Sequence, residues 1–291
     1  MRNRILNTTT IAAAIAVCVA LVSGCSDGTG FSVEEPNGAE NAPALPAVST
    51  MKFELNFFGV EAPVVDQQSL KSGGPATAAA TSAGEHANWI NAFVRALYVQ
   101  LITYDNLSAP VAAFALAIHS VPQEVEPGTY LWTYIFIDDG TEYSIFLYGT
   151  PQTDRVVWRM EVSSNDAEFA LDHFVWFDGE SMKDDSAGFW QFYEPIDASS
   201  GEETARIDWT KSAEQKQTTI TVNGASHEDS GDYLEFTESD EMGSIVHYDA
   251  SEDLLSDITW YADGSGSLMV PDYNNGDPAC WDTEQVNADC E

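Results

Sequence analysis

An oxygen-rich turn near the C-terminus is the part of the sequence best suited to hold a cation. Asp272, Asn274, Asn275 and Asp277 surround Gly276. Carboxylate and amide oxygens gathered on a turn suit calcium. The spacing departs from the EF-hand loop, which also needs a distal glutamate, and a simple polar turn is the favoured interpretation. The four residues are therefore a candidate calcium loop, and the sequence predicts no cofactor.

The five histidines show no pattern that would bind a transition metal. They are His86, His119, His173, His227 and His247, and no two lie within five residues of each other. A helical metal site needs two histidines about one turn apart. We therefore interpret each as a structural residue, and we predict no metal centre.

Nucleophilic and acid–base motifs are equally sparse. Ser49 and Lys52 match S-x-x-K, but the K-T-G and S-D-N partners of penicillin-recognising enzymes do not occur in the chain. Carboxylate pairs could hydrolyse glycosides, yet among 47 acidic residues such pairs arise everywhere and carry no information. We expect a protein that is not an enzyme and that has no catalytic residues.

The N-terminus has the layout of an export signal. Arg2 and Arg4 precede an uncharged apolar run over residues 11–21, and small residues follow it. This arrangement is typical of a secretory signal peptide. The run is shorter than the roughly 20 apolar residues that span a bilayer, so we expect cleavage.

The end of this signal, Val22-Ser23-Gly24-Cys25, resembles the lipobox of bacterial lipoproteins at all four positions. The resemblance implies that Cys25 becomes the new N-terminus, with diacylglyceryl on its thiol and a further acyl chain such as palmitate on its amine. Two or more acyl chains hold a protein firmly at a membrane. Ser26, in place of an aspartate, favours the outer membrane of a Gram-negative bacterium. The expected location is the cell envelope, with the chain anchored through Cys25.

The four cysteines divide into three roles. Cys18 leaves with the signal, and the resemblance assigns Cys25 to lipidation. Cys280 and Cys290 remain as an even pair in an oxidising compartment, where a disulfide is the natural interpretation.

The charge of the mature chain limits its partners. Cleavage leaves nine basic residues against 47 acidic ones, a formal charge near −38. Such a field repels phosphate backbones and anionic lipid headgroups, which excludes nucleic acid and direct electrostatic docking on membranes. Divalent cations or salt would screen the repulsion between the acids.

Composition divides the chain into three parts. Residues 1–24 are the signal peptide, and residues 25–50, with Pro36, Pro43 and Pro46 among small polar residues, are a flexible tether. Residues 51–291 form a single β-rich domain. We divide it into a strand plus helical pair at 51–128, a β meander at 129–270 and a disulfide-closed tail at 271–291.

The helical pair is predicted from apolar periodicity. Phe53, Leu55 and Phe57 first alternate with polar residues as in a strand. A capping box at Ser82 and Glu85 then opens an amphipathic helix, whose apolar residues recur every four positions over residues 89–101. We expect a break at residues 105–106 and a second, buried helix to about residue 119.

Short aromatic and β-branched runs follow, separated by turn residues. Alternation within the run at 155–163 places Arg159 and Glu161 on the face opposite Trp158 and Met160. Tight turns such as residues 138–140 predict hairpins. We expect strands at 129–137, 142–149, 155–163, 171–178, 188–194, 204–210, 217–223, 232–237, 243–248, 256–261 and 266–270.

These strands predict a mainly β fold. Sequential hairpins make an antiparallel up-and-down meander, and closure into a barrel or a curved half-barrel would protect its edges. The N-terminal helical pair would pack on the concave face or across one end. A β-sandwich is the alternative.

Three functions are compatible with these features. The leading hypothesis is a membrane-anchored envelope lipoprotein whose β domain is non-catalytic and serves binding or structure, with an envelope protein as a possible partner. The alternative is a carrier or sensor of an apolar small molecule or lipid, held inside the curved sheet by its aromatic residues. The third is an envelope hydrolase, which would need two facing carboxylates with shifted acidity.

Overall fold

The computed structural model describes residues 39–51, 84–117, 119–138, 140–167, 169–224 and 229–290. Several expectations lie outside these ranges. They are the signal peptide, Cys25, most of the tether, the strand around Phe53, and His227.

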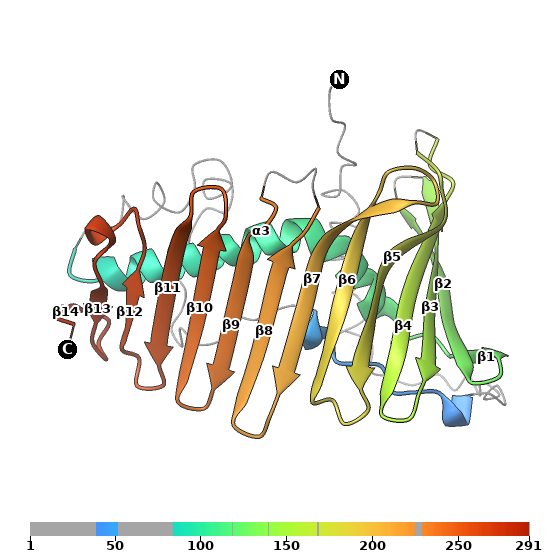
Figure 1. Cartoon of the computed structure of the whole chain (residues 1–291), viewed down its shortest axis with the longest axis horizontal. Helices are drawn as coiled ribbons and strands as arrows, with labels where there is room; N and C mark the ends of the chain where they lie inside the picture. The colour runs from blue at the N-terminus through green and yellow to red at the C-terminus, as the bar shows by residue number, and fades with distance from the viewer. Residues whose placement is uncertain are drawn as a thin grey trace, which may run out of the picture. The chain divides into compact units, whose positions relative to one another are not determined.

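The β meander is confirmed. Fourteen strands follow one another in a single sheet in chain order, and the neighbouring strands pair antiparallel (Figure 1). The strands are β1 (Gln123–Glu126), β2 (Thr129–Asp138), β3 (Thr141–Pro151), β4 (Arg155–Ser164), β5 (Leu171–Met182), β6 (Ala187–Pro195), β7 (Gly201–Lys211), β8 (Gln215–Val222), β9 (Tyr233–Ser239), β10 (Met242–Asp249), β11 (Leu254–Tyr261), β12 (Gly266–Met269), β13 (Ala279–Trp281) and β14 (Asn287–Ala288).

Closure into a barrel is wrong. The strand order begins at β1 and ends at β14, and these two strands do not pair with each other. A physical reason lies in their lengths, because β1 has four residues and β14 has two. Strands this short cannot seal a sheet whose other members reach 12 residues.

The chain packs as two compact units. Among the described residues, unit 1 contains those within 39–51 and 105–204, and unit 2 contains those within 84–104 and 205–290. One helix, α3 (Ala87–Ala117), and strand β7 each contribute residues to both units.

The predicted helical pair is a single helix. Both segments are helical, but α3 continues through Asp105 and Asn106, so the expected break is wrong. Aspartate and asparagine cost a helix less than about 1 kcal/mol each, which the burial of apolar residues on either side outweighs. Pro110 also lies within the helix. In the described part of the chain, no helix has the length and apolar character needed to cross a membrane.

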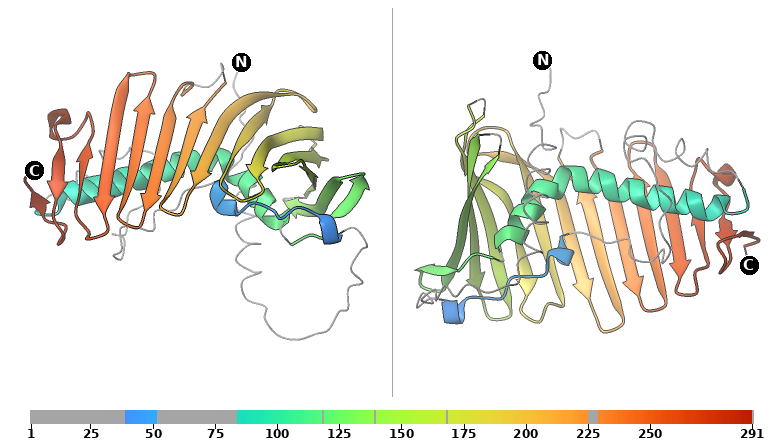
Figure 2. Two further views of the ribbon diagram at one scale, coloured as in Figure 1. Left: turned by 60° about the horizontal axis from the view of Figure 1, so that its bottom comes forward. Right: turned by 180° about the vertical axis from the view of Figure 1, so that it is seen from behind.

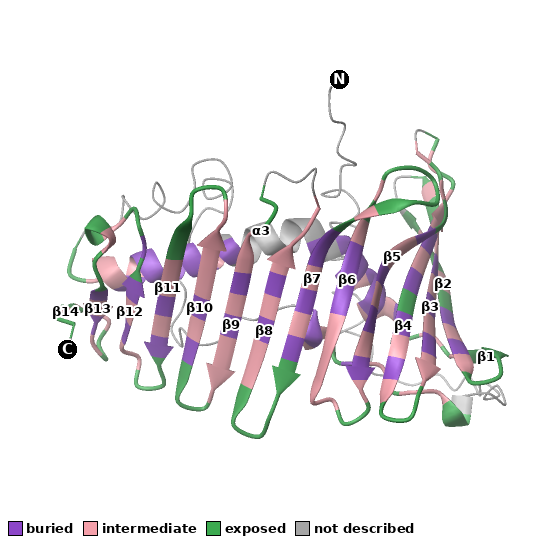
Figure 3. Cartoon of the chain, viewed as in Figure 1, coloured by how far each residue is buried: buried purple, intermediate pink, exposed green. Residues whose placement is uncertain are grey.

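In unit 1 the end of α3 covers one face of the sheet, which we call the inner face. The ring of Phe114 lies 6.1 Å from that of Phe177 and 5.5 Å from that of Trp190. Figure 2 shows this end of α3 beside the sheet from two further directions. Along β3, Ile145 and Leu147 are buried while Phe146 between them is half-buried, and Figure 3 shows the same alternation on neighbouring strands. The face that points away from α3 is the outer face.

Glycine and tryptophan alternate across the inner face. In unit 1 the row runs from Gly149 to Trp158, Gly179 and Trp190 on β3 to β6. In unit 2 it runs through Gly243, Trp260, Gly266 and Trp281 on β10 to β13. Each indole ring occupies the space over a glycine on the neighbouring strand, which leaves no room for a Cβ there.

In unit 2 the C-terminal tail holds the start of α3. The side-chain amide of Asn88 donates to the carbonyl of Cys280 over 2.6 Å, and the backbone N–H of Asn287 donates to the carbonyl of Glu85 over 2.6 Å. The predicted disulfide between Cys280 and Cys290 is confirmed. The disulfide closes a loop over residues 280–290, which contains both Cys280 and Asn287 and so both hydrogen bonds to the start of α3.

The end of the predicted tether belongs to the folded part of unit 1. Two short 3-10 helices, η1 (Ala39–Asn41) and η2 (Val48–Thr50), lie here, and Thr50 and Met51 are buried. The hydroxyl of Thr50 accepts a hydrogen bond from the indole N–H of Trp190 over 3.1 Å. Thr50 therefore belongs to the folded domain, and a flexible tether would end before this residue.

Candidate functional site

The outer face of unit 1 gathers aromatic and charged side chains on three neighbouring strands. Successive strand residues point to opposite faces, so the residues between the buried positions of β3 and β4 share the outer face. The register places Phe146 opposite Glu161 and Tyr148 opposite Arg159. We call Phe146, Tyr148, Arg159, Glu161 and His173 the Glu161 cluster.

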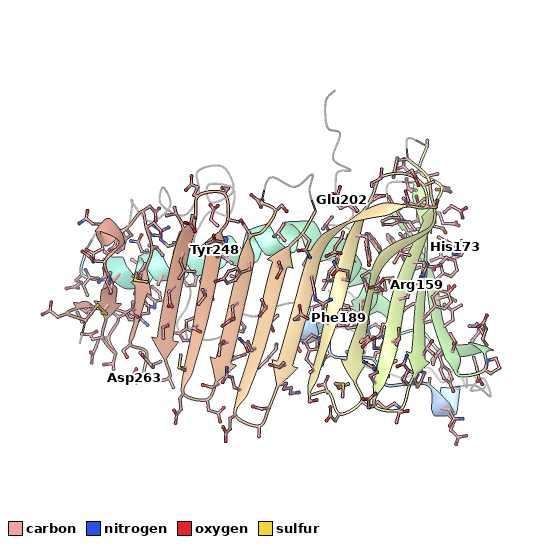
Figure 4. All side chains as sticks on the ribbon, in the orientation of Figure 1. Arg159, His173, Phe189, Glu202, Tyr248 and Asp263 are labelled. Atoms are coloured by element: carbon pink, nitrogen blue, oxygen red, sulfur yellow. A yellow bond between two sulfur atoms is a disulfide. The ribbon has the colours of Figure 1, made fainter. Side chains whose placement is uncertain are left out.

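Glu161 lies at the centre of the cluster. One carboxylate oxygen is 2.8 Å from Nε of Arg159, and the other is 3.0 Å from Nδ1 of His173. Because a carboxylate only accepts hydrogen bonds, Nδ1 of His173 carries the proton and donates it. The Glu161 side chain is 12% exposed, whereas those of Arg159 and His173 are 54% and 55% exposed. Figure 4 shows Arg159 and His173 on the neighbouring strands β4 and β5.

His173 owes its position to an irregular stretch of β5. The pairing register between β4 and β5 shifts at two places, and one of them lies beside this residue. His173 has a φ of 50°, in the left-handed region, and its N–H donates to Oγ of Ser163 over 2.9 Å. A bulge of this kind can redirect a side chain. Here the imidazole stacks on Phe146, with ring centroids 4.8 Å apart.

The two tyrosines of this face remain neutral phenols at physiological pH. Burial raises the pKa of Tyr148, and the charge of Glu161 adds to the rise while Arg159 opposes it. Tyr193 on β6 donates its hydroxyl to Asp178 over 3.1 Å, and burial together with that carboxylate raises the pKa of Tyr193 to about 12. Both tyrosines can therefore donate a hydrogen bond to a ligand or to a neighbour.

The candidate calcium loop forms a turn with internal hydrogen bonds. Asp272 is ion-paired with Arg95 over 2.9 Å. The amide of Asn274 donates to the carbonyls of Asp277 and Pro278, and Asn275 has a φ of 58°. The described residues contain no group of three or more histidine, cysteine, aspartate or glutamate side chains placed to hold a metal ion.

The histidines occupy separate places. His86 contacts the carbonyl of Gln285 through Nδ1 over 2.9 Å, and His119 is exposed after α3. His247 is half-buried, and burial lowers its pKa from the ordinary 6.5. Ser49 lies in η2, while Lys52, its partner in the S-x-x-K match, is outside the described residues.

Sequence reasoning placed Arg159 and Glu161 on one face but did not single out the cluster. Alternation along a strand reveals a shared face, whereas the approach of His173 depends on a register shift that has no clear sequence signal. Comparison of the chain with protein-family models, with curated proteins and with solved structures found no match.

Proposed function

We propose that this chain is a lipid-anchored protein of the bacterial cell envelope that binds a partner on the outer face of unit 1 and catalyses no reaction. The observation that carries the binding part is the Glu161 cluster. Both oxygens of its central carboxylate are engaged, and the side chains of Arg159 and His173 beside it are half exposed. Such a site presents fixed polar groups at a surface, and its carboxylate is already bonded to two neighbours.

A glycan of the cell envelope is the ligand class that fits this surface best. The rings of Phe146 and Tyr148 are half-buried and present apolar area, and Arg159 and His173 supply hydrogen-bonding groups beside them. A sugar ring offers a matching apolar face and a rim of hydroxyls. The fixed orientation of His173, stacked on Phe146 and bonded to Glu161, reduces the entropy cost of binding.

The carrier alternative has less support. A lipid carrier needs an open apolar cavity, and in unit 1 the inner face is occupied by the side chains of α3 such as Phe114. The hydrolase alternative needs a carboxylate free to exchange a proton with a substrate. Glu161 is held by two partners instead.

The binding proposal is tested by titrating the purified chain with soluble peptidoglycan fragments and, separately, with lipopolysaccharide core oligosaccharide. We expect binding of one of these glycans, and we expect Glu161→Gln to weaken it by about tenfold, equivalent to about 1.4 kcal/mol. Asp208→Asn is the matched control, because Asp208 forms a similar ion pair with Arg206 on the outer face of unit 2. Equal affinity in both variants, or no glycan binding by the native chain, would remove the proposal.

The anchor is tested by intact mass spectrometry of protein extracted from membranes. We expect acyl mass on Cys25, loss of that mass in Cys25→Ser, and no effect of Cys18→Ser, since Cys18 is discarded with the signal. A native chain without acyl mass would show that Cys25 is not lipidated.

A further inference from the structure

Strand β2 has an open edge along most of its length. Strand β3 pairs with β2 over residues 130–138, but β1 pairs only with Thr129, Tyr130 and Leu131. Among the described strands, none pairs with the other side of residues 132–138. The edge lies at the β1 end of the sheet (Figure 1). Backbone groups along such an edge are available to another strand.

This edge belongs to a well-supported strand whose single charged residue is Asp138, at its end. Residues 129–137 contain no charged side chain. Trp132 is buried on the inner face, and the hydroxyl of Tyr134 donates to the carbonyl of Ala113 in α3, so the strand is held firmly in unit 1. Ile135 and Ile137 point the other way and are 61% and 69% exposed. Natural proteins usually protect such an edge with charges or a covering segment.

Acidic residues lie near both ends of the open edge. Glu124 and Glu126 are exposed on β1, and Glu142, also exposed, lies on β3, opposite Ile137 and one strand in from the edge. Antiparallel pairing of two copies through this edge would bring the Glu142 end of each copy beside the Glu124 and Glu126 end of the other. Like charges would then repel at both ends. A strand with basic residues at its ends would be attracted instead.

We propose that residues 132–138 accept a β-strand from a partner, an extended segment with alternating apolar residues and a lysine or arginine at each end. The main-chain hydrogen bonds of strand addition supply affinity, and the side chains on either face supply specificity. Ile135 and Ile137 contact the apolar residues of the incoming strand, and Glu124, Glu126 and Glu142 contact its basic ends. This site uses the backbone edge of β2 and does not depend on glycan binding, although Thr133 lies opposite Phe146 of the Glu161 cluster.

The test is a titration of the purified chain with three blocked nine-residue peptides. The first alternates valine with threonine and has lysine at both ends, the second has glutamate at the ends, and the third has proline at its centre. We expect the first to bind, and the second and third to bind at least about tenfold more weakly, because they lose charge complementarity and a backbone N–H respectively.

The matched variants are Ile135→Lys with Ile137→Lys, and Ile196→Lys, which changes an isoleucine that is 66% exposed elsewhere in unit 1. The double variant should weaken peptide binding at least about tenfold, and Ile196→Lys should leave it unchanged, with equal melting temperatures as the check on folding. Equal effects of the two variants would overturn the proposal. So would a self-association that the double variant abolishes without any peptide binding.

Discussion

Gly243 lies directly opposite Trp260 on the inner face of unit 2, and a Cβ on Gly243 would stand 1.9 Å from Cζ2 of that indole. The ring occupies the place where any other residue would carry its side chain. Gly149 and Trp158 repeat the arrangement in unit 1, where the corresponding distance to Cζ3 is 2.6 Å. Packing explains why these two positions are glycine. Neither has a positive φ, so the backbone conformation does not itself require glycine there.

Gly243→Ala should destabilise the protein. The new methyl group must displace a buried ring, and overpacking of this kind costs about 1–3 kcal/mol. Urea unfolding would measure the loss. In Gly243→Ala combined with Trp260→Leu the ring is gone, so the alanine should cost much less than it does alone. Strictly additive losses in the double variant would contradict the packing explanation.

Thr50→Val should also lower the free energy of unfolding. Valine has a similar shape but no hydroxyl, so the buried indole N–H of Trp190 loses its acceptor, at a cost of about 1–3 kcal/mol. The control is Thr210→Val at an exposed position of β7, with an expected change within about 0.5 kcal/mol. Equal denaturation midpoints for the two variants would show that the hydrogen bond between Thr50 and Trp190 does not stabilise the fold.

Asp272→Asn tests the candidate calcium loop and the Arg95 ion pair together. Arg95 has a side chain that is only 10% exposed, so loss of its anionic partner should cost about 1–3 kcal/mol. Asp277→Asn, an exposed change in the same loop, should cost less than about 0.5 kcal/mol.

Melting with and without calcium completes this experiment, because a bound ion raises the midpoint by mass action. If the loop binds no ion, calcium should shift the midpoint of the native chain and of both variants equally. A calcium shift that both substitutions abolish would establish the loop as a calcium site.

His247 should make the stability depend on pH. Burial lowers the pKa of His247 below 6.5. The nearby carboxylates of Asp232, Asp249 and Asp229 raise this pKa, but their effect is smaller than that of burial. The unfolded chain therefore takes up a proton near pH 6.5 and the folded chain only at lower pH. Since the unfolded state binds more protons between these values, stability is full above about pH 6.5 and falls as the pH decreases.

His247→Gln removes this contribution. Urea unfolding from about pH 8 to about pH 5.5, where most carboxylates remain ionised, should show a steeper loss in the native chain than in the variant. Parallel curves would mean that His247 titrates alike in the folded and unfolded states.

The strand pattern could be predicted from the sequence because it depends on neighbours along the chain. Turn residues such as Gly140 and Gly264, both with a positive φ in the structure, separate the runs of apolar and β-branched residues. Tight hairpins between such runs force antiparallel neighbours. The disulfide was predictable for a different reason, since only two cysteines remain once Cys18 and Cys25 are assigned.

The continuity of α3 could not be predicted in the same way. Asp105, Asn106 and Pro110 are local signals for an interruption, and their cost is small beside the burial of the apolar residues around them. The Glu161 cluster could not be predicted from the sequence for a related reason. Its members come from three strands, and the register shift that aims His173 is not encoded in any short motif.

The sequence is enough to predict the meander, with alternate residues on opposite faces, because hairpin turns and period-two patterning act over a few residues. Long-range packing settles that the sheet stays open, that indoles lie over glycines, and that Thr50 is buried against Trp190. These features depend on contacts between side chains that are tens of residues apart in the sequence. Such contacts are determined by how the elements pack together and not by the conformational preferences of any one segment.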